Sequence, residues 1–171
     1  MPPLSLSDDG LMALIPLRAI DRKTVRAYAI IDAADAEWAN QWRWCLDHDG
    51  YVIRVGKTPD GSRITSFKLH RELLGLVPDD GLEGDHINRI KLDNRRENLR
   101  PVPDGKNVQN QGSQPGSSSY RGVTWSKQHR KWQAQTFAAG KYRYLGYFDR
   151  EEDAAEAARA GRARLLPYAT D

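Results

Sequence analysis

Short runs of alternating apolar and polar residues fill the first third of the chain. The segments IPL, RAYAIID and GYVIRV between Leu14 and Val55 follow this pattern, and Asp47, Asp49 and Gly50 place turn-forming residues among them. Alternation with a period of two puts every second side chain on the same face of a strand. The pattern therefore predicts a small antiparallel sheet.

The stretch DAADAEWANQWRWCL has a different period. Trp38, Trp42 and Leu46 recur every four residues, and Asp32 or Asp35 can start a helix. We expect a short helix here, with tryptophans that belong to the core or cover the sheet, because each buries a large apolar area.

Two further elements are predicted before residue 85. Residues 64–69 are rich in apolar and β-branched side chains and indicate a strand, and residues 70–76 indicate a short helix that Gly75 and Pro78 end. The segment PDDGLEG is rich in turn formers and predicts a loop that leads to Asp85 and His86.

The C-terminal third follows a predicted linker, GSQPGSSS, at residues 112–119. Behind it, YRGVTWS, KWQAQTFAA and KYRYLGYF predict three strands, and Asp149 can cap a helix that runs to about Arg164. The expected fold class is α+β, with an N-terminal sheet region at 1–62, a central region at 63–111, the linker, and a sheet packed on one helix at 120–171.

Composition and charge narrow the functional classes. Cys45 is the single cysteine, so internal disulfides and thiolate metal clusters are excluded. No stretch approaches the roughly 20 apolar residues of a membrane span, and the start lacks the basic segment of a signal peptide, so we expect a cytoplasmic protein. The net charge is only +3, but residues 120–147 hold six basic and no acidic side chains, which suits a phosphate backbone.

The candidate chemistry lies in GDHINRIKLDNRRENLRPVPDGKNVQNQ, residues 84–111. Phosphodiester hydrolysis needs a base that activates water and a cation that stabilises the added negative charge. His86 can act as the base, and Asp85 and Asn107, the latter on a helix expected to begin near Asp104, can hold the cation. The alternative is that these residues and the neighbouring asparagines only form turns and caps.

This stretch resembles the HNH endonucleases, particularly a subgroup found in phages and mobile introns. LHRELLG at 69–75, DHINRIKLDNRRENLR at 85–100 and KNVQN at 106–110 carry the resemblance. It implies a ββα-metal fold, in which two antiparallel strands and a helix hold one divalent metal. The central region at 63–111 is then the nuclease core.

The resemblance also implies residue roles. Asp85 and Asn107 match the metal ligands, His86 matches the general base, and Asn98 matches an asparagine that organises the loop and helps to hold the histidine. Oxygen ligands favour Mg²⁺ or Mn²⁺ over Zn²⁺. His70 matches an upstream His-Arg pair, for which structural support and phosphate contact are equally open.

The loop before Asn98 contains Arg95 and Arg96, which match a basic segment of the family. They are candidates for contact with DNA phosphates, with a solvated charge run as the alternative.

YRGVTW, KWQAQ and LGYFDREEDAAEAARA, in residues 120 to about 165, resemble the plant Apetala/ethylene-response-factor DNA-binding domain. Such a sheet can enter the major groove of double-stranded DNA. Thr124 and Trp125 stand where plant members often have a further Arg, so the plant sequence preference is not transferred. The candidate DNA contacts are Arg121, Trp125, Arg130, Trp132 and Arg143, with sheet core as an equal alternative for the two tryptophans.

Together these features predict a metal-dependent DNA endonuclease of the homing type that needs no small-molecule cofactor. We expect it to act as a monomer and to nick one strand. If a phage encodes it, the expected location is the cytoplasm of the bacterial host. A DNA-binding or regulatory protein on an inactive nuclease fold is the main alternative. A nuclease directed to RNA or to DNA structure is less favoured, because the major groove of A-form RNA is too narrow for a sheet.

Overall fold

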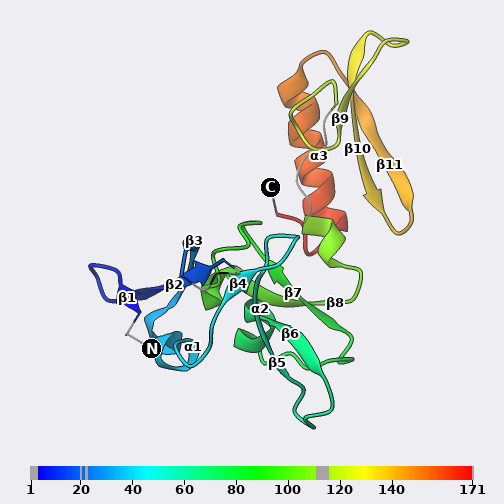
Figure 1. Cartoon of the computed structure of the whole chain (residues 1–171). Coiled ribbons are helices and arrows are strands. Elements are labelled where there is room, and N and C mark those ends of the chain that lie inside the picture. Colours follow the sequence, from blue (N-terminus) through cyan, green and yellow to red (C-terminus); the bar gives the residue numbers. More distant parts are fainter. Residues whose placement is uncertain (1–3, 20, 22, 111–115, 171) are drawn as a thin grey trace. The chain divides into compact units, whose positions relative to one another are not determined.

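The computed structural model describes residues 4–19, 21, 23–110 and 116–170. The chain forms two compact units, Met1–Gly105 and Lys106–Asp171, which Figure 1 colours along the sequence. The predicted α+β class is confirmed: small antiparallel sheets alternate with short helices, and a longer helix follows the last sheet. Among the described helices, none combines the length and apolar character needed to cross a membrane.

The first unit begins with a three-stranded antiparallel sheet of β1 (Ser5–Leu6), β2 (Met12–Arg18) and β3 (Val25–Asp32). Every second residue of β2 is buried, which matches the predicted alternation. A 3-10 turn, η1 (Ala33–Asp35), and one helical turn, α1 (Ala36–Ala39), follow. The helix is shorter than predicted: the chain turns after Ala39, whose carbonyl oxygen accepts from the backbone N–H of Trp42 and from the buried Trp44 indole.

A second antiparallel sheet consists of β4 (Cys45–Leu46), β5 (Val52–Lys57) and β6 (Ile64–Lys68). The helix α2 (Leu69–Leu73) continues directly from β6. The boundary expected between residues 62 and 63 lies inside the β5–β6 hairpin, so the N-terminal and central regions share one unit.

The predicted loop before Asp85 is partly a strand. β7 (Leu82–His86) pairs with β8 (Leu99–Pro103) in an antiparallel ladder, and the 3-10 turn η2 (Arg96–Asn98) leads into β8. The Gly-rich local sequence predicts a turn, but pairing with β8 satisfies the backbone of residues 82–86 as a strand.

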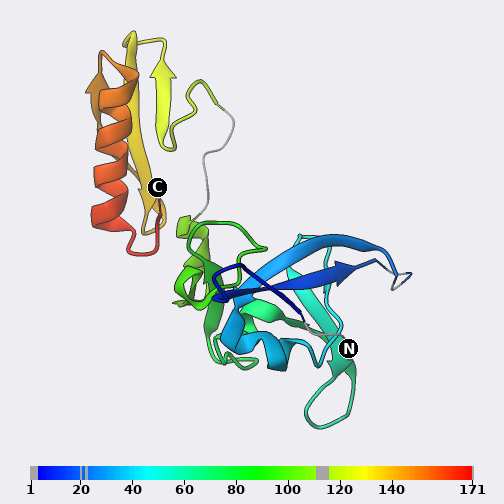
Figure 2. The same cartoon turned by 90° about the vertical axis from the view of Figure 1, so that its left-hand side faces the viewer.

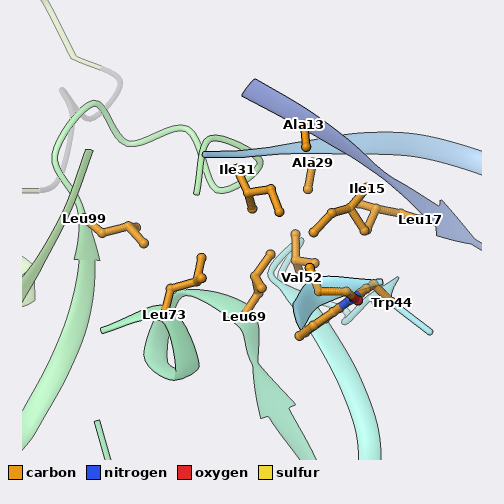
Figure 3. Packing of buried hydrophobic residues seen from close by; sticks show 11 residues of the cluster. Ala13, Ile15, Leu17, Ala29, Ile31, Trp44, Val52, Leu69, Leu73 and Leu99 are labelled. Atoms are coloured by element: carbon orange, nitrogen blue, oxygen red, sulfur yellow. The ribbon is translucent and has the colours of Figure 1, made fainter. Parts of the chain in front are cut away.

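One apolar core joins these elements. Side chains of β2, β3, α2 and β8 meet Trp44 and Val52, as Figure 3 shows. Each fully buried aliphatic side chain stabilises the fold by roughly 1.5–3 kcal/mol. The N-terminal sheet is therefore the support of the central region, because both close over the same core. The buried members are Ala13, Ile15, Leu17, Ala29, Ile31, Ala39, Trp44, Val52, Leu69, Leu73 and Leu99.

The second unit contains η3 (Asn107–Asn110), β9 (Val123–Ser126), β10 (Lys131–Ala138), β11 (Lys141–Phe148) and α3 (Glu151–Leu165). The sheet order β11-β10-β9 is antiparallel, and α3 lies along the sheet in Figure 1 and Figure 2. This confirms the predicted sheet packed on one helix. Leu145, Phe148, Ala154 and Ala158 pack between sheet and helix, as expected.

Three local features of this unit differ from expectation. Asn107 starts a 3-10 turn rather than an α-helix beginning near Asp104. The N-cap of α3 is Arg150, and Asp149 forms an ion pair with Lys131 instead of capping the helix. Of the predicted linker, residues 111–115 lie outside the described residues, while Ser118 is buried and donates to Glu151.

Candidate functional site

Asp85 and His86 are the last two residues of β7, and both side chains are almost fully buried, with 3% and 4% exposure. The ladder places Arg100 of β8 opposite Asp85. Nε and Nη2 of Arg100 lie 2.8 and 2.7 Å from Oδ2 of Asp85. The guanidinium group of Arg100 therefore already contacts the carboxylate that the sequence assigns to metal binding.

The ring of His86 is oriented by Asn94. Nε2 of His86 lies 3.2 Å from Oδ1 of Asn94, and Nδ2 of Asn94 donates to the carbonyl oxygen of Lys91. Because Oδ1 can only accept, Nε2 carries the proton and the lone pair of the neutral ring is on Nδ1. Burial lowers the pKa of His86, so the ring is neutral at neutral pH and suits a general base.

Asn98 organises the loop that carries Asn94. Its Nδ2 donates to Oδ1 of Asn88 and to the carbonyl oxygen of Asp93, and its Oδ1 accepts from the backbone N–H of Asn88. Asn98 thus closes the loop, whereas the direct contact with the His86 ring comes from Asn94.

The N-terminal sheet holds the same loop from outside. Ile30 of β3 forms a bridge with Asp93, its backbone N–H donates to the carbonyl oxygen of Leu92, and its carbonyl oxygen accepts from the backbone N–H of Asn94. Asn94 is fully buried as a result. The sheet thereby determines where the side chain that orients His86 can lie.

His70 packs directly against the candidate base. The rings of His70 and His86 meet edge to face with centroids 4.9 Å apart, and Tyr51 lies 5.2 Å from His70. Burial lowers the pKa of His70 to about 3, so it is neutral in the folded protein. Gly84 is required beside it, since a Cβ there would lie 2.4 Å from Cδ2 of His70. The buried geometry favours structural support over direct phosphate contact for His70.

Arg95 and Arg96 form ion pairs within the first unit. Arg95 pairs with Asp93 and Glu97. Arg96 pairs with Asp35 and also donates to the carbonyl oxygen of Leu73 at the end of α2. Both guanidinium groups therefore brace the loop, and their predicted contact with DNA stays a prediction.

The donor set fits a hard divalent cation. Asp85 and Asn107 both offer oxygen atoms, which Mg²⁺ and Mn²⁺ prefer, and Mg²⁺ retains several waters so that few protein ligands suffice. Among the residues that the structure describes, no cluster of three or more His, Cys, Asp or Glu could hold a metal. Asp85 belongs to the first unit and Asn107 to the second, so their joint ligation of a metal stays a prediction.

In the second unit the sheet register separates two faces. Trp132 pairs with Trp125 and with Phe148, so these three side chains share the face that packs toward α3. Trp132 packs against the core, and Trp125 meets it edge to face at 5.1 Å while staying 38% exposed. For Trp132 the structure favours the core interpretation over DNA contact.

The opposite face of the sheet carries polar and aromatic side chains that the sequence interpretation did not select. Directly opposed pairs define it: Gln133 with Thr124 and Tyr147, Gln135 with Tyr144, and Phe137 with Tyr142. Phe137, Tyr142 and Tyr144 are all more than half exposed. The sequence could have revealed this face through the alternation of residues along each strand. Gln133 and Gln135 flank the buried Ala134, so both point to the side opposite the core. We name this set the outer face.

The three predicted arginines of this unit differ in environment. Nη2 of Arg121 donates to the carbonyl oxygen of Gln109, and the carbonyl oxygen of Arg121 accepts from the buried Arg162. Arg130 is exposed in the β9–β10 turn with a φ of 53°. Arg143 is exposed on β11 opposite Thr136, on the face toward α3. Arg130 and Arg143 are therefore accessible, while Arg121 braces the unit.

Two comparisons with known proteins match separate parts of the chain. A family model described as HNH endonuclease matches residues 71–109, a range that contains Asp85, His86, Asn98 and Asn107. In the C-terminal region the chain is 52% identical over 48 residues to the AP2-like ethylene-responsive transcription factor PLT2 of Arabidopsis thaliana, over 27% of this chain and 8% of that protein. No solved structure matches the chain. The chain therefore carries an HNH endonuclease domain, followed by an AP2-like region in which a three-stranded sheet packs on one helix.

Proposed function

We propose that this protein is an endonuclease that hydrolyses phosphodiester bonds of double-stranded DNA with the help of Mg²⁺ or Mn²⁺. The observation that carries the proposal is the contact between His86 and Asn94, which assigns the lone pair of a neutral, buried imidazole to Nδ1, directly after Asp85 in β7. This is the arrangement of a general base that takes a proton from water. Asp85 and Asn107 would hold the cation, which supplies stabilisation of the charge that develops on the phosphate and the leaving oxygen.

The AP2-like unit supports DNA as the substrate. Its outer face combines glutamine carboxamides, which can pair with adenine edges, with exposed tyrosines. We assign DNA contact to this face and to Arg130 in the β9–β10 turn. Contact of Arg143 with DNA, from the face toward α3, stays a separate prediction. We expect Gln135→Ala with Tyr144→Ala to weaken binding to duplex DNA roughly tenfold without unfolding the unit, because base-edge contacts are lost. Equal binding by this double variant would contradict the assignment.

One site cuts one strand, so the expected product of a monomer is nicked DNA. We propose a homing-type element of a phage, acting in a bacterial cytoplasm, as the biological setting. A monomer that linearises plasmid in a single binding event would contradict the nicking model. Sedimentation of the protein alone and on DNA measures the oligomeric state in the same preparation.

The decisive experiment is a supercoiled-plasmid assay with Mg²⁺, with EDTA, and with His86→Ala, on DNA that carries an intron-insertion region of the source genome. We expect metal-dependent nicking that the variant abolishes. Binding without cleavage under any divalent metal would instead support the alternative of an inactive DNA-binding protein.

A further inference from the structure

Three segments of the first unit bring two lysines to one tyrosine ring. Tyr51 precedes β5, Lys68 ends β6, and Lys91 lies in the loop between β7 and β8. Nζ of Lys68 lies 4.4 Å from the centroid of the Tyr51 ring, and Nζ of Lys91 lies 4.2 Å from it. The electron-rich face of an aromatic ring attracts a cation, so Tyr51 orders both ammonium groups. We call Lys68 and Lys91 the lysine pair.

The lysine pair differs from the arginines around it. Arg54, Arg71 and Arg100 each face a carboxylate, and so do Arg95 and Arg96. Within the described part of the chain, neither lysine forms an ion pair. Lys91 donates to the backbone carbonyl oxygen of Asp49, an acceptor without net charge.

An anion that lies against either ammonium group is attracted to its positive charge. Both lysines are half-buried, so bulk water screens their charges less than at an open surface. Four carboxylates, those of Asp47, Asp49, Glu83 and Asp85, also act on Tyr51. Since neither lysine pairs with a carboxylate among the described residues, both ammonium groups can still attract an anion.

The position of the pair indicates which anion. The Tyr51 ring lies 6.1 Å from the ring of His86 and 5.2 Å from that of His70, centroid to centroid. An anion on the lysine pair is thus a close neighbour of the group that would activate water. The anion with which a nuclease must align its base is the phosphodiester backbone of the strand being cut.

We propose that Lys68 and Lys91 bind the phosphodiester backbone of the cut strand beside His86, with Tyr51 as the platform that orders them. That the bound strand is the one being cut rests on the proposed nuclease function, whereas the phosphate contact rests on the lysine geometry alone. Tyr51 and Lys68 lie outside the segment that matches the HNH model, whereas Lys91 lies within it.

The test measures how DNA binding by the full chain depends on salt. Fluorescence anisotropy with a duplex, in EDTA so that no cleavage occurs, gives the dissociation constant across a range of KCl concentrations. Each phosphate contact contributes roughly 0.9 to the slope of log K against log salt. We expect Lys68→Gln with Lys91→Gln to reduce the slope by about 2.

The matched control is Lys23→Gln with Lys57→Gln, which removes the same charge from two exposed lysines of the same unit. Its slope should stay within about 0.5 of the wild-type value, because long-range electrostatics change while no contact is lost. Lys68→Arg with Lys91→Arg keeps both charges and should restore the slope. Thermal unfolding of each variant verifies that the first unit is folded.

The outcomes separate the two proposals. An unchanged slope in the Lys68→Gln, Lys91→Gln variant, or an equal loss in the control, overturns the lysine site even where His86→Ala abolishes nicking. If the variant has a reduced slope but the wild-type protein never cleaves DNA, the nuclease proposal is overturned and the phosphate site stands. If both hold, the variant raises KM for nicking roughly tenfold with little change in kcat, since uniform binding is lost.

Discussion

Oδ1 of Asn94 lies 3.2 Å from Nε2 of His86, and both side chains are buried. This contact assigns the ring proton to Nε2 and the basic lone pair to Nδ1. The buried loop between β7 and β8, held by Asn98 from within and by Ile30 from β3, keeps the contact in place. The orientation of the candidate base is thus a property of the whole first unit.

The first prediction concerns this contact. Replacing Asn94 by Leu removes the acceptor, so the ring loses its orientation, and kcat for nicking falls by roughly 10- to 100-fold, part of the effect of a positioned base. Asn94→Asp keeps an acceptor at the same place and retains more activity than the Leu variant. Rates are measured under single turnover and corrected for the folded fraction. Equal rates for wild type and Asn94→Leu would rule out the orienting role.

The second prediction concerns Arg100, whose guanidinium contacts Oδ2 of Asp85. Arg100→Gln removes a positive charge from the candidate metal ligand, so a divalent cation binds more tightly. The same change destabilises the metal-free protein by roughly 1–3 kcal/mol, because a buried carboxylate loses a charged donor. We expect MnCl₂ to raise the Tm of the variant more than that of the wild type. A smaller rise in the variant contradicts the model, and Arg54→Gln is the control for loss of an ion pair elsewhere.

The third prediction follows from the low pKa of His70, about 3 in the folded chain because of burial. Below its ordinary pKa near 6.5, His70 takes up a proton only when the protein unfolds. The stabilising contribution of the neutral ring is complete above pH 6.5 and is lost as the pH falls toward 3. Compared with His70→Phe, which does not titrate, the wild type should lose up to about 1.4 kcal/mol per pH unit.

Urea unfolding of the wild type and His70→Phe at pH 7, 6 and 5 measures this difference directly. The comparison cancels the groups that titrate in both proteins. A difference that is independent of pH would show that His70 titrates alike in the folded and unfolded chains.

The fourth prediction concerns Gly122, whose φ is +80° and whose added Cβ would lie 2.4 Å from the carbonyl oxygen of Gln135. Gly122→Ala is strained by the backbone angle and by contact with backbone atoms of β10, so we expect at least about 2 kcal/mol of destabilisation. Gly140→Ala has a similar φ, +77°, but nothing within 4 Å of its Cβ, and should cost about 1 kcal/mol. Thermal unfolding measures the stability of both variants, and a gel shift on duplex DNA measures their binding. Equal losses of stability in the two variants would contradict the steric account.

Most strands were predictable because their signal is local. The alternation in residues 12–18 and 131–138 marks β2 and β10, and the acidic first turn marks α3. The elements that differed depend on distant partners. β7 exists because β8 pairs with it, and the chain turns at the end of α1, where Trp42 and Trp44 both donate to the carbonyl oxygen of Ala39.

Local patterns in the sequence were enough for the α+β class, for the C-terminal sheet with its helix, and for an HNH segment that contains Asp85, His86, Asn98 and Asn107. Three features required the folded chain: the orientation of His86 by Asn94, the exposure of the outer face, and the contact of two lysines with Tyr51. The two groups differ in the range of the interactions on which they depend. Periodicity and turn chemistry act over a few residues, whereas these contacts join segments that come together only when the core closes.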